Sequence, residues 1–282
     1  MDVVRDLAAT LLALAAAVML ALWAPALWLQ GTIIERDGFL SVAEPLAEDA
    51  DYQRTLSDAA VDGVLEEAPI PGLLSDQLAP VLQEQAPRIT GTEEYRTSWT
   101  LAMEDLHATL LDPAGGTVRA DLNPLSGLLL DPFNDTFGTS IEVPDSDTLR
   151  IPIAHIPPSS WPDRLQALAG TSGWIGWVGF AVAVLGIAVA SHRRILTFVL
   201  GLLVALAAGA QLLVSQFIEL LVPDSFDQAD VVGGIIQAFE AHFRDAMVAP
   251  AMALLGAGVL LIVVALVLLS MGGRPARAPG RS

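Results

Sequence analysis

The sequence predicts an α-helical membrane protein with four transmembrane helices and one sizeable domain outside the lipid. Four apolar runs contain no Lys, Arg, Asp or Glu, and they cover residues 7–29, 173–190, 195–218 and 247–271. Runs of about 20 apolar residues match the hydrocarbon thickness of a bilayer. Apolar residues make up 53% of the chain, the net charge is −18, and the acidic residues gather between the first and second runs. This separation of apolar and acidic sequence is typical of a membrane anchor joined to an exposed domain.

The apolar runs and the basic residues beside them divide the chain into nine segments. Arg193 and Arg194 follow the second run directly, and arginines also occur in the tail, so both segments are expected in the cytoplasm. Trp23, Trp28, Trp174 and Trp177 then fall at outer membrane boundaries, where indole rings are enriched. We predict a cytoplasmic stub at 1–6, transmembrane helices at 7–29, 172–190, 195–221 and 247–271, an acidic extracytoplasmic domain at 30–171, a cytoplasmic link at 191–194, an extracytoplasmic amphipathic loop at 222–246 and a basic cytoplasmic tail at 272–282.

The first apolar run has two interpretations. It is longer than the h-region of roughly 7–15 residues in a signal peptide, and its flank lacks a typical small-residue cleavage site. A retained signal anchor is therefore the preferred interpretation, and a cleaved signal peptide stays open. With the anchor retained, the predicted protein is multi-pass in the plasma membrane, with both termini in the cytoplasm.

Two patterns within the spans point to helix packing and to polar contacts. Small residues recur every four positions, a spacing that lets helix backbones approach closely in lipid. The predicted packing residues are Gly201, Ala205, Gly209, Ala249, Ala253 and Ala257. The end of the third span carries a polar stripe of Gln211, Ser215 and Glu219. Polar groups at this depth face a bundle interior, a cavity or a partner, so the stripe fits either packing or conduction.

The acidic domain is predicted to be α+β and mostly helical. Helical periodicity covers 41–67, 73–85 and 92–111, and the last of these begins with Thr92 as a plausible N-cap. Segments 117–122, 140–143 and 148–154 read as strands, the last weakened by Pro152. Shorter helices are expected at 123–130 and from Trp161 into the second span. In the second outer loop, Val232, Ile236, Phe239 and Phe243 predict an amphipathic helix that leads into the fourth span.

No motif for catalysis or for cofactor binding is present. The chain has no cysteine, which excludes disulfides, thiolate nucleophiles and Cys-ligated metals. There is no GxSxG, HExxH or phosphate-binding glycine loop, and the acidic charge disfavours nucleic acid. We therefore name no catalytic residue, no cofactor and no metal ligand. The scattered histidines His107, His155 and His242 are weak metal candidates, and the more ordinary expectation for His107 is a hydrogen bond at a helix edge.

One segment of the outer domain resembles a known family. Tyr95, Trp99 and His107 lie along one helix, and an Asp121-Leu122-x-Pro124 turn follows the next strand. This arrangement is similar to an uncharacterised family of actinobacterial integral membrane proteins with a helical extracytoplasmic domain and four spans. The resemblance implies a Gram-positive cell envelope and no catalytic role. Glu104 and Asp105 depart from the more basic or amide-rich character of that helix in the family.

The expected function is that of a non-enzymatic integral membrane protein of the cell envelope. Its outer domain would serve as an assembly, scaffolding or sensing module for another membrane or envelope protein, and a homo-oligomer is the alternative partner. The protein is expected to contact the lipid bilayer and is not expected to bind nucleic acid. Two further functions remain open, a small transporter or channel component that uses the polar stripe, and an outer-face hydrolase or metal-binding protein.

Overall fold

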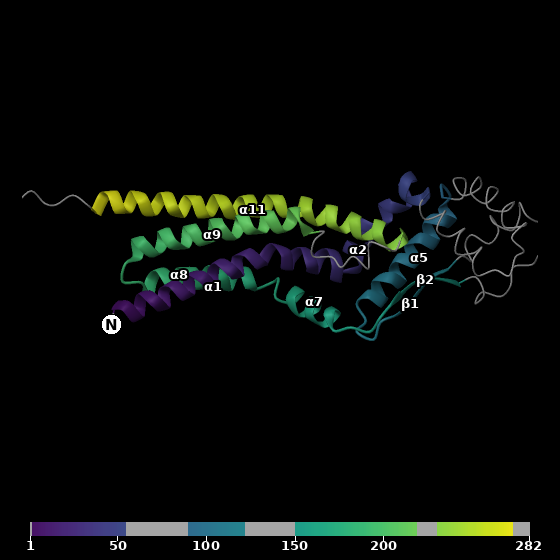
Figure 1. The fold of residues 1–282 in the computed structure, drawn as a ribbon, viewed down its shortest axis with the longest axis horizontal. Coiled ribbons are helices and arrows are strands. Elements are labelled where there is room, and N and C mark those ends of the chain that lie inside the picture. The colour runs from purple at the N-terminus through teal and green to yellow at the C-terminus, as the bar shows by residue number, and fades with distance from the viewer. Residues whose placement is uncertain (1, 55–89, 122–149, 219–229, 273–282) are drawn as a thin grey trace, which may run out of the picture. The chain divides into compact units, whose positions relative to one another are not determined.

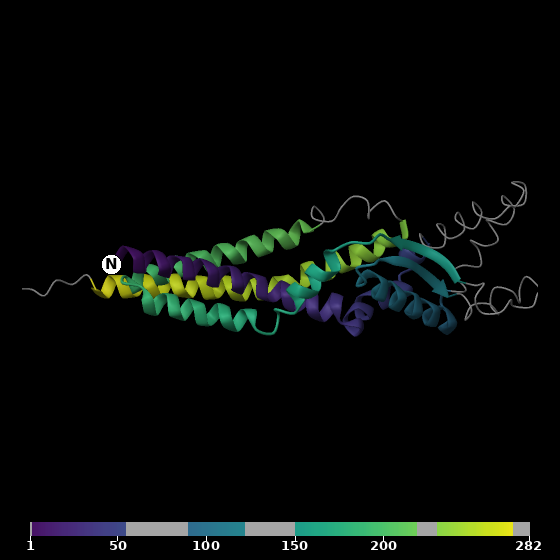
Figure 2. The same ribbon diagram turned by 90° about the horizontal axis from the view of Figure 1, so that it is seen from below.

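The chain folds into two compact units in the computed structural model, which describes residues 2–54, 90–121, 150–218 and 230–272 (Figures 1 and 2). Unit 1 contains Met1–Leu29, Leu168–Ile218 and Phe243–Ser282. Unit 2 contains Gln30–Ala167 and Glu219–His242. Both units are therefore assembled from segments that lie far apart in the sequence.

Long apolar helices form unit 1. The helix α1 covers Asp2–Trp28, α9 covers Arg193–Gln216, and α11 covers Asp230–Gly272. In the described chain, three helical stretches are long and apolar enough to cross a membrane, namely Val3–Ile34, Arg193–Gln216 and Gly233–Met271. The prediction of a mostly helical, membrane-embedded protein is confirmed at this level.

The predicted second span, at 172–190, differs from the other three. Its helix α8 covers Ile175–Val189, only 15 residues. At about 1.5 Å per residue such a helix is roughly 22 Å long, shorter than the hydrocarbon core of about 30 Å. Figures 1 and 2 show α8 side by side with α1, and its buried Ala183 packs in the same cluster as Ala9, Ala13 and Ala16 of α1.

The helix that begins at Trp161 does not run into α8, so that prediction is wrong. This helix, α7, covers Trp161–Ala169, and turns occupy the residues before Ile175. The intervening sequence Gly170-Thr-Ser-Gly173 has poor helix propensity. The Thr171 hydroxyl also donates to the Leu168 carbonyl at 2.7 Å, a local bond that competes with helix continuation.

The described part of unit 2 has helices and a pair of strands. After α1, a π-helical turn η1 covers Leu29–Ile34, α2 covers Arg36–Ala43, and a 3₁₀ turn η2 covers Glu44–Ala47. The helix α5 covers Glu93–Leu110, and the Thr92 side chain accepts a hydrogen bond from the Tyr95 amide. The predicted helix at 92–111 and its N-cap are thus confirmed.

The strands β1, Gly116–Asp121, and β2, Arg150–Ile156, pair antiparallel. An irregularity lies between Val118 and Arg119, and Arg119 is aligned with Pro152, which has no amide hydrogen to donate. Both predicted strands are confirmed. The predicted elements at 73–85, 123–130 and 140–143 lie outside the described residues, as does the part of 41–67 beyond residue 54.

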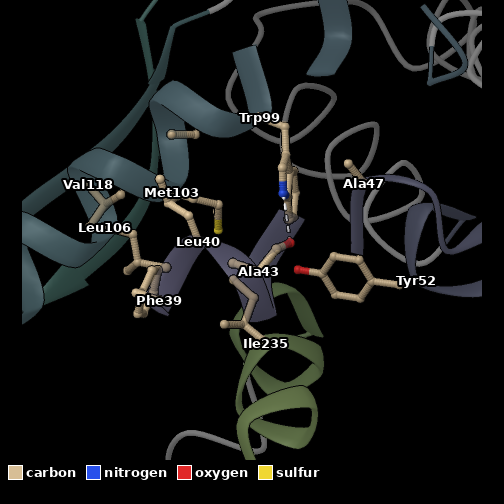
Figure 3. Packing of buried hydrophobic residues seen from close by; sticks show 11 residues of the cluster. Phe39, Leu40, Ala43, Ala47, Tyr52, Trp99, Met103, Leu106, Val118 and Ile235 are labelled. Atoms are coloured by element: carbon tan, nitrogen blue, oxygen red, sulfur yellow. Dashed lines mark hydrogen bonds between the residues drawn. The ribbon is translucent and has the colours of Figure 1, made fainter. Parts of the chain in front are cut away.

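The core of unit 2 joins three distant parts of the chain (Figure 3). Phe39, Leu40 and Ala43 come from α2, and Trp99, Met103 and Leu106 come from α5; Ala47, Tyr52, Ala102, Val118 and Ile235 complete the cluster. The Phe39 ring also lies 4.9 Å from that of Phe239 on α11. The residues just after the first predicted span and those just before the last one therefore share one hydrophobic core.

Candidate functional site

Polar side chains on the inner face of α5 bind the backbone of the segment that follows α1. The Trp99 indole Nε1 donates to the Ala43 carbonyl at 3.0 Å, as the dashed line in Figure 3 marks. His107 Nε2 lies 3.0 Å from the Ile33 carbonyl oxygen. Arg36 of α2 also forms an ion pair with Glu104 of α5. These contacts fix α2 and the end of η1 against α5.

His107 has a structural partner. Because a carbonyl oxygen only accepts, His107 Nε2 carries the proton and donates it. Ile33 is the second-last residue of η1, and the terminal carbonyls of a helix lack partners within the helix. The imidazole also contacts the Phe39 ring, with centroids 5.0 Å apart. This geometry matches the helix-edge hydrogen bond that the sequence favours for His107.

The other two candidate histidines lie elsewhere. His155 is on β2, where its backbone pairs with Thr117, and His242 is exposed on α11. Among residues 2–54, 90–121, 150–218 and 230–272, no group of three His, Asp or Glu side chains is close enough to hold a metal ion. The part of the chain that the structure describes therefore shows no metal-binding group around His107 or His242.

Both tyrosines of the chain lie at the edge of the unit 2 core. The Tyr95 hydroxyl donates to Gln53, and the Tyr52 ring packs edge-on against Trp99 with centroids 5.8 Å apart. Burial raises the pKa of Tyr95 from 10.0 to about 12. Burial, and then the neighbouring Tyr95, also raise the pKa of Tyr52.

We expect tyrosinate absorbance to rise only when unit 2 unfolds in alkali. Folding favours the neutral phenols, so their contribution to stability is complete below pH 10.0 and is lost toward pH 12 as the unfolded chain ionises. The free energy of unfolding should fall there by up to about 1.4 kcal/mol per pH unit for each tyrosine. Ultraviolet titration of the native chain measures the ionisation of the two tyrosines. The Tyr95→Phe variant leaves Tyr52 as the only tyrosine, so its ionisation can be followed separately. Ionisation near pH 10.0 while the circular dichroism stays native would contradict the expectation.

The opposite face of α5 is accessible. A shallow, open hollow there is lined by Glu93, Arg96, Thr97, Thr100 and Leu101. The Leu101 side chain is 44% exposed. This face presents both charged groups and an apolar side chain to the surroundings.

The described members of the polar stripe are buried within unit 1. Gln211 Nε2 donates to the Met247 sulfur at 3.4 Å, and the Ser215 hydroxyl donates to the Leu212 carbonyl at 2.9 Å. Glu219 lies outside the described residues. The partners of Gln211 and Ser215 thus come from the bundle itself.

The predicted packing residues divide into two groups. A Cβ on Gly201 would lie 2.8 Å from the Gly258 carbonyl oxygen, and a Cβ on Gly258 would lie 2.7 Å from the Ala205 amide nitrogen. Gly201 and Ala205 therefore lie where α9 crosses α11. A Cβ on Gly209 would meet nothing within 4 Å, and Ala249, Ala253 and Ala257 are exposed. Packing through those four residues stays a prediction.

A polar cluster at one end of unit 1 has no counterpart among the predicted sites. Arg5 donates to the Val189 carbonyl at 3.0 Å, and Asp6 accepts from the Ser191 amide at 2.9 Å. Asp6 also lies 2.9 Å from His192 Nδ1. The start of α1 is thereby tied to the link between α8 and α9. In the sequence, Arg5 and Asp6 directly precede the first predicted span, and Ser191 and His192 directly follow the second. These polar flanks are the sequence feature from which the cluster could have been predicted.

Comparison with known proteins gives no match, since no family model, no curated protein sequence and no solved structure is significantly similar to this chain. The resemblance to an actinobacterial membrane family therefore stays a prediction.

Proposed function

We propose that this chain is a non-enzymatic integral membrane protein of the cell envelope whose unit 2 is an extracytoplasmic assembly, scaffolding or sensing module. The observation that carries the proposal is the shared core of unit 2. Phe39 follows the first span closely in sequence, Phe239 precedes the last one, and their rings are 4.9 Å apart. An event at the surface of this unit would therefore act on chain segments that lead into two membrane helices.

The proposed topology has four spans, both termini in the cytoplasm and an α+β outer domain. Positive residues mark cytoplasmic segments. The tie between Asp6 and His192 supports a common side for the stub at 1–6 and the link at 191–194. In this topology α8 is a short second span that packs on α1. No described contact favours conduction or hydrolysis, so neither alternative is proposed.

Site-specific photo-crosslinking in cells tests the partner role. A photoreactive side chain at Leu101, on the exposed face of α5, should give a discrete adduct with one envelope protein or with a second copy of this chain. Leu213 of α9, which is 62% exposed, is the matched control for non-specific contacts within the membrane. The Leu101 adduct should disappear when Trp99→Ala disrupts the unit 2 core. A strictly monomeric protein in nanodiscs, with no discrete adduct at Leu101, would refute the proposal.

A further inference from the structure

Arg244 lies at the end of unit 1 that carries the tryptophans. Phe243 precedes it on α11 and packs edge-on against Trp28, with ring centroids 4.8 Å apart. Further back along α1, the Trp23 indole donates to the Ser172 carbonyl at 3.1 Å and lies 6.2 Å from the Trp177 ring. Indole rings prefer the boundary between lipid and water. The position of these rings indicates that Arg244 is close to a membrane interface.

The charge pattern along α11 also indicates that Arg244 lies close to a membrane interface. Arg244 and Asp245 are the last charged residues before the uncharged stretch 246–271. A long cationic side chain at the start of such a stretch extends its charged group toward the headgroups while its methylene stem stays in apolar surroundings. The Arg244 guanidinium is therefore expected at the level of the lipid headgroups.

The Arg244 guanidinium has no protein partner in the described part of the chain. Its Nε is buried and makes no hydrogen bond, and Arg244 forms no ion pair there. A buried donor without an acceptor is costly, and Arg244 as a whole is only partly buried, so an anionic ligand at the surface would balance the charge of its guanidinium. Arg5, by comparison, donates to the Val189 carbonyl.

The surface of α11 beyond Arg244 is apolar and open. Val248 and Met252 lie one and two turns further on the same face of the helix, and they are 44% and 54% exposed. A ligand that fits this face has an anionic group at one end and a hydrocarbon chain below it. The guanidinium fork matches the oxygen geometry of a phosphate.

We propose that Arg244 binds the phosphodiester of a phospholipid headgroup, with an acyl chain lying along Val248 and Met252. This lipid contact is independent of the role of unit 2, since it uses residues of unit 1 alone. It gives the acidic chain one specific attachment to a phosphate-bearing lipid at the tryptophan end of its spans.

Native mass spectrometry of the full, delipidated chain tests the lipid site. The ligands are phosphatidylglycerol, phosphatidylcholine, a diacylglycerol with the same acyl chains, and inorganic phosphate. We expect both phospholipids to bind at least about tenfold more tightly than diacylglycerol or inorganic phosphate, because only they combine a phosphate with acyl chains. Equal binding of diacylglycerol, or equally tight binding of inorganic phosphate, would overturn the proposal without any variant.

Variants locate the site. Arg244→Gln should weaken phospholipid binding about tenfold, and Arg244→Lys less, because lysine keeps the charge but loses the fork. Arg164→Gln, which removes an exposed arginine of α7, is the control with the same change in net charge and should bind like the native chain. If Arg244→Gln does not fold, Arg244→Lys and Met252→Ser provide the comparison. Native affinity in folded Arg244→Gln, or in both of these replacement variants, would overturn the assignment.

Discussion

Gly38→Ala is expected to disrupt the junction between η1 and α2. A Cβ at Gly38 would overlap the Gly31 carbonyl oxygen and lie 2.7 Å from its carbonyl carbon. Both groups belong to the backbone, so no side chain can rotate away. The turn is already fixed by a bond from the Glu35 amide to the Gln30 carbonyl at 3.0 Å, a five-residue spacing typical of a π-helix. We expect a loss of about 3 kcal/mol in the free energy of unfolding of unit 2.

Gly31→Ala is the matched control, because a Cβ there meets nothing within 4 Å. It removes a helical glycine from the same turn and should be neutral or stabilising by up to about 1 kcal/mol. Urea unfolding of the full chain in nanodiscs, followed by near-ultraviolet circular dichroism, compares the two variants. Equal midpoints for Gly38→Ala and Gly31→Ala would show that the close approach does not limit stability.

Gly258→Ala is expected to separate α9 from α11 in unit 1. The added methyl would lie 2.7 Å from the Ala205 amide nitrogen and 2.8 Å from the Gly201 carbonyl oxygen. Contacts of Cα hydrogens with carbonyl oxygens contribute at such crossings and depend on close backbones. We expect a destabilisation of about 2 kcal/mol, the middle of the range for overpacking.

The control for this crossing lies two residues earlier on the same helix. Gly256→Ala adds the same methyl where nothing lies within 4 Å. Thermal unfolding of the purified full chain in one detergent should give a lower midpoint for Gly258→Ala and a native-like midpoint for Gly256→Ala. A similar loss in both variants would indicate a general effect on α11 rather than a specific crossing.

Local sequence signals predicted the elements whose formation depends on nearby residues. The helix α5 has an N-cap at Thr92 and a regular apolar face, and both signals act within a few residues. The end of α7 was not predicted. The apolar periodicity continues past Ala169 and predicts one unbroken helix, whereas Gly170-Thr-Ser-Gly173 has weak helix propensity and ends it. Apolar periodicity alone therefore did not reveal the break between α7 and α8.

Long-range partners were less accessible from the sequence. His107 was recognised at a helix edge, but its partner Ile33 is 74 residues away. In α11, alanine and glycine are so frequent that several faces qualify for close packing. The described crossing uses Gly258, whereas the stripe through Ala253 is exposed. Only the position of α9 distinguishes these faces, and helical spacing does not contain that information.

The divided core of unit 2 sets an order for biosynthesis. Chains emerge from the ribosome N-terminus first, and domains generally fold as units. Phe39 and Trp99 are made early, but Ile235 and Phe239 follow only after the residues of α8 and α9 have been translated. Until then the apolar surface around Phe39 is incomplete and open to chaperones or to premature association. Completion of this core thus reports that the polypeptide has been synthesised through α9 and into the first part of α11.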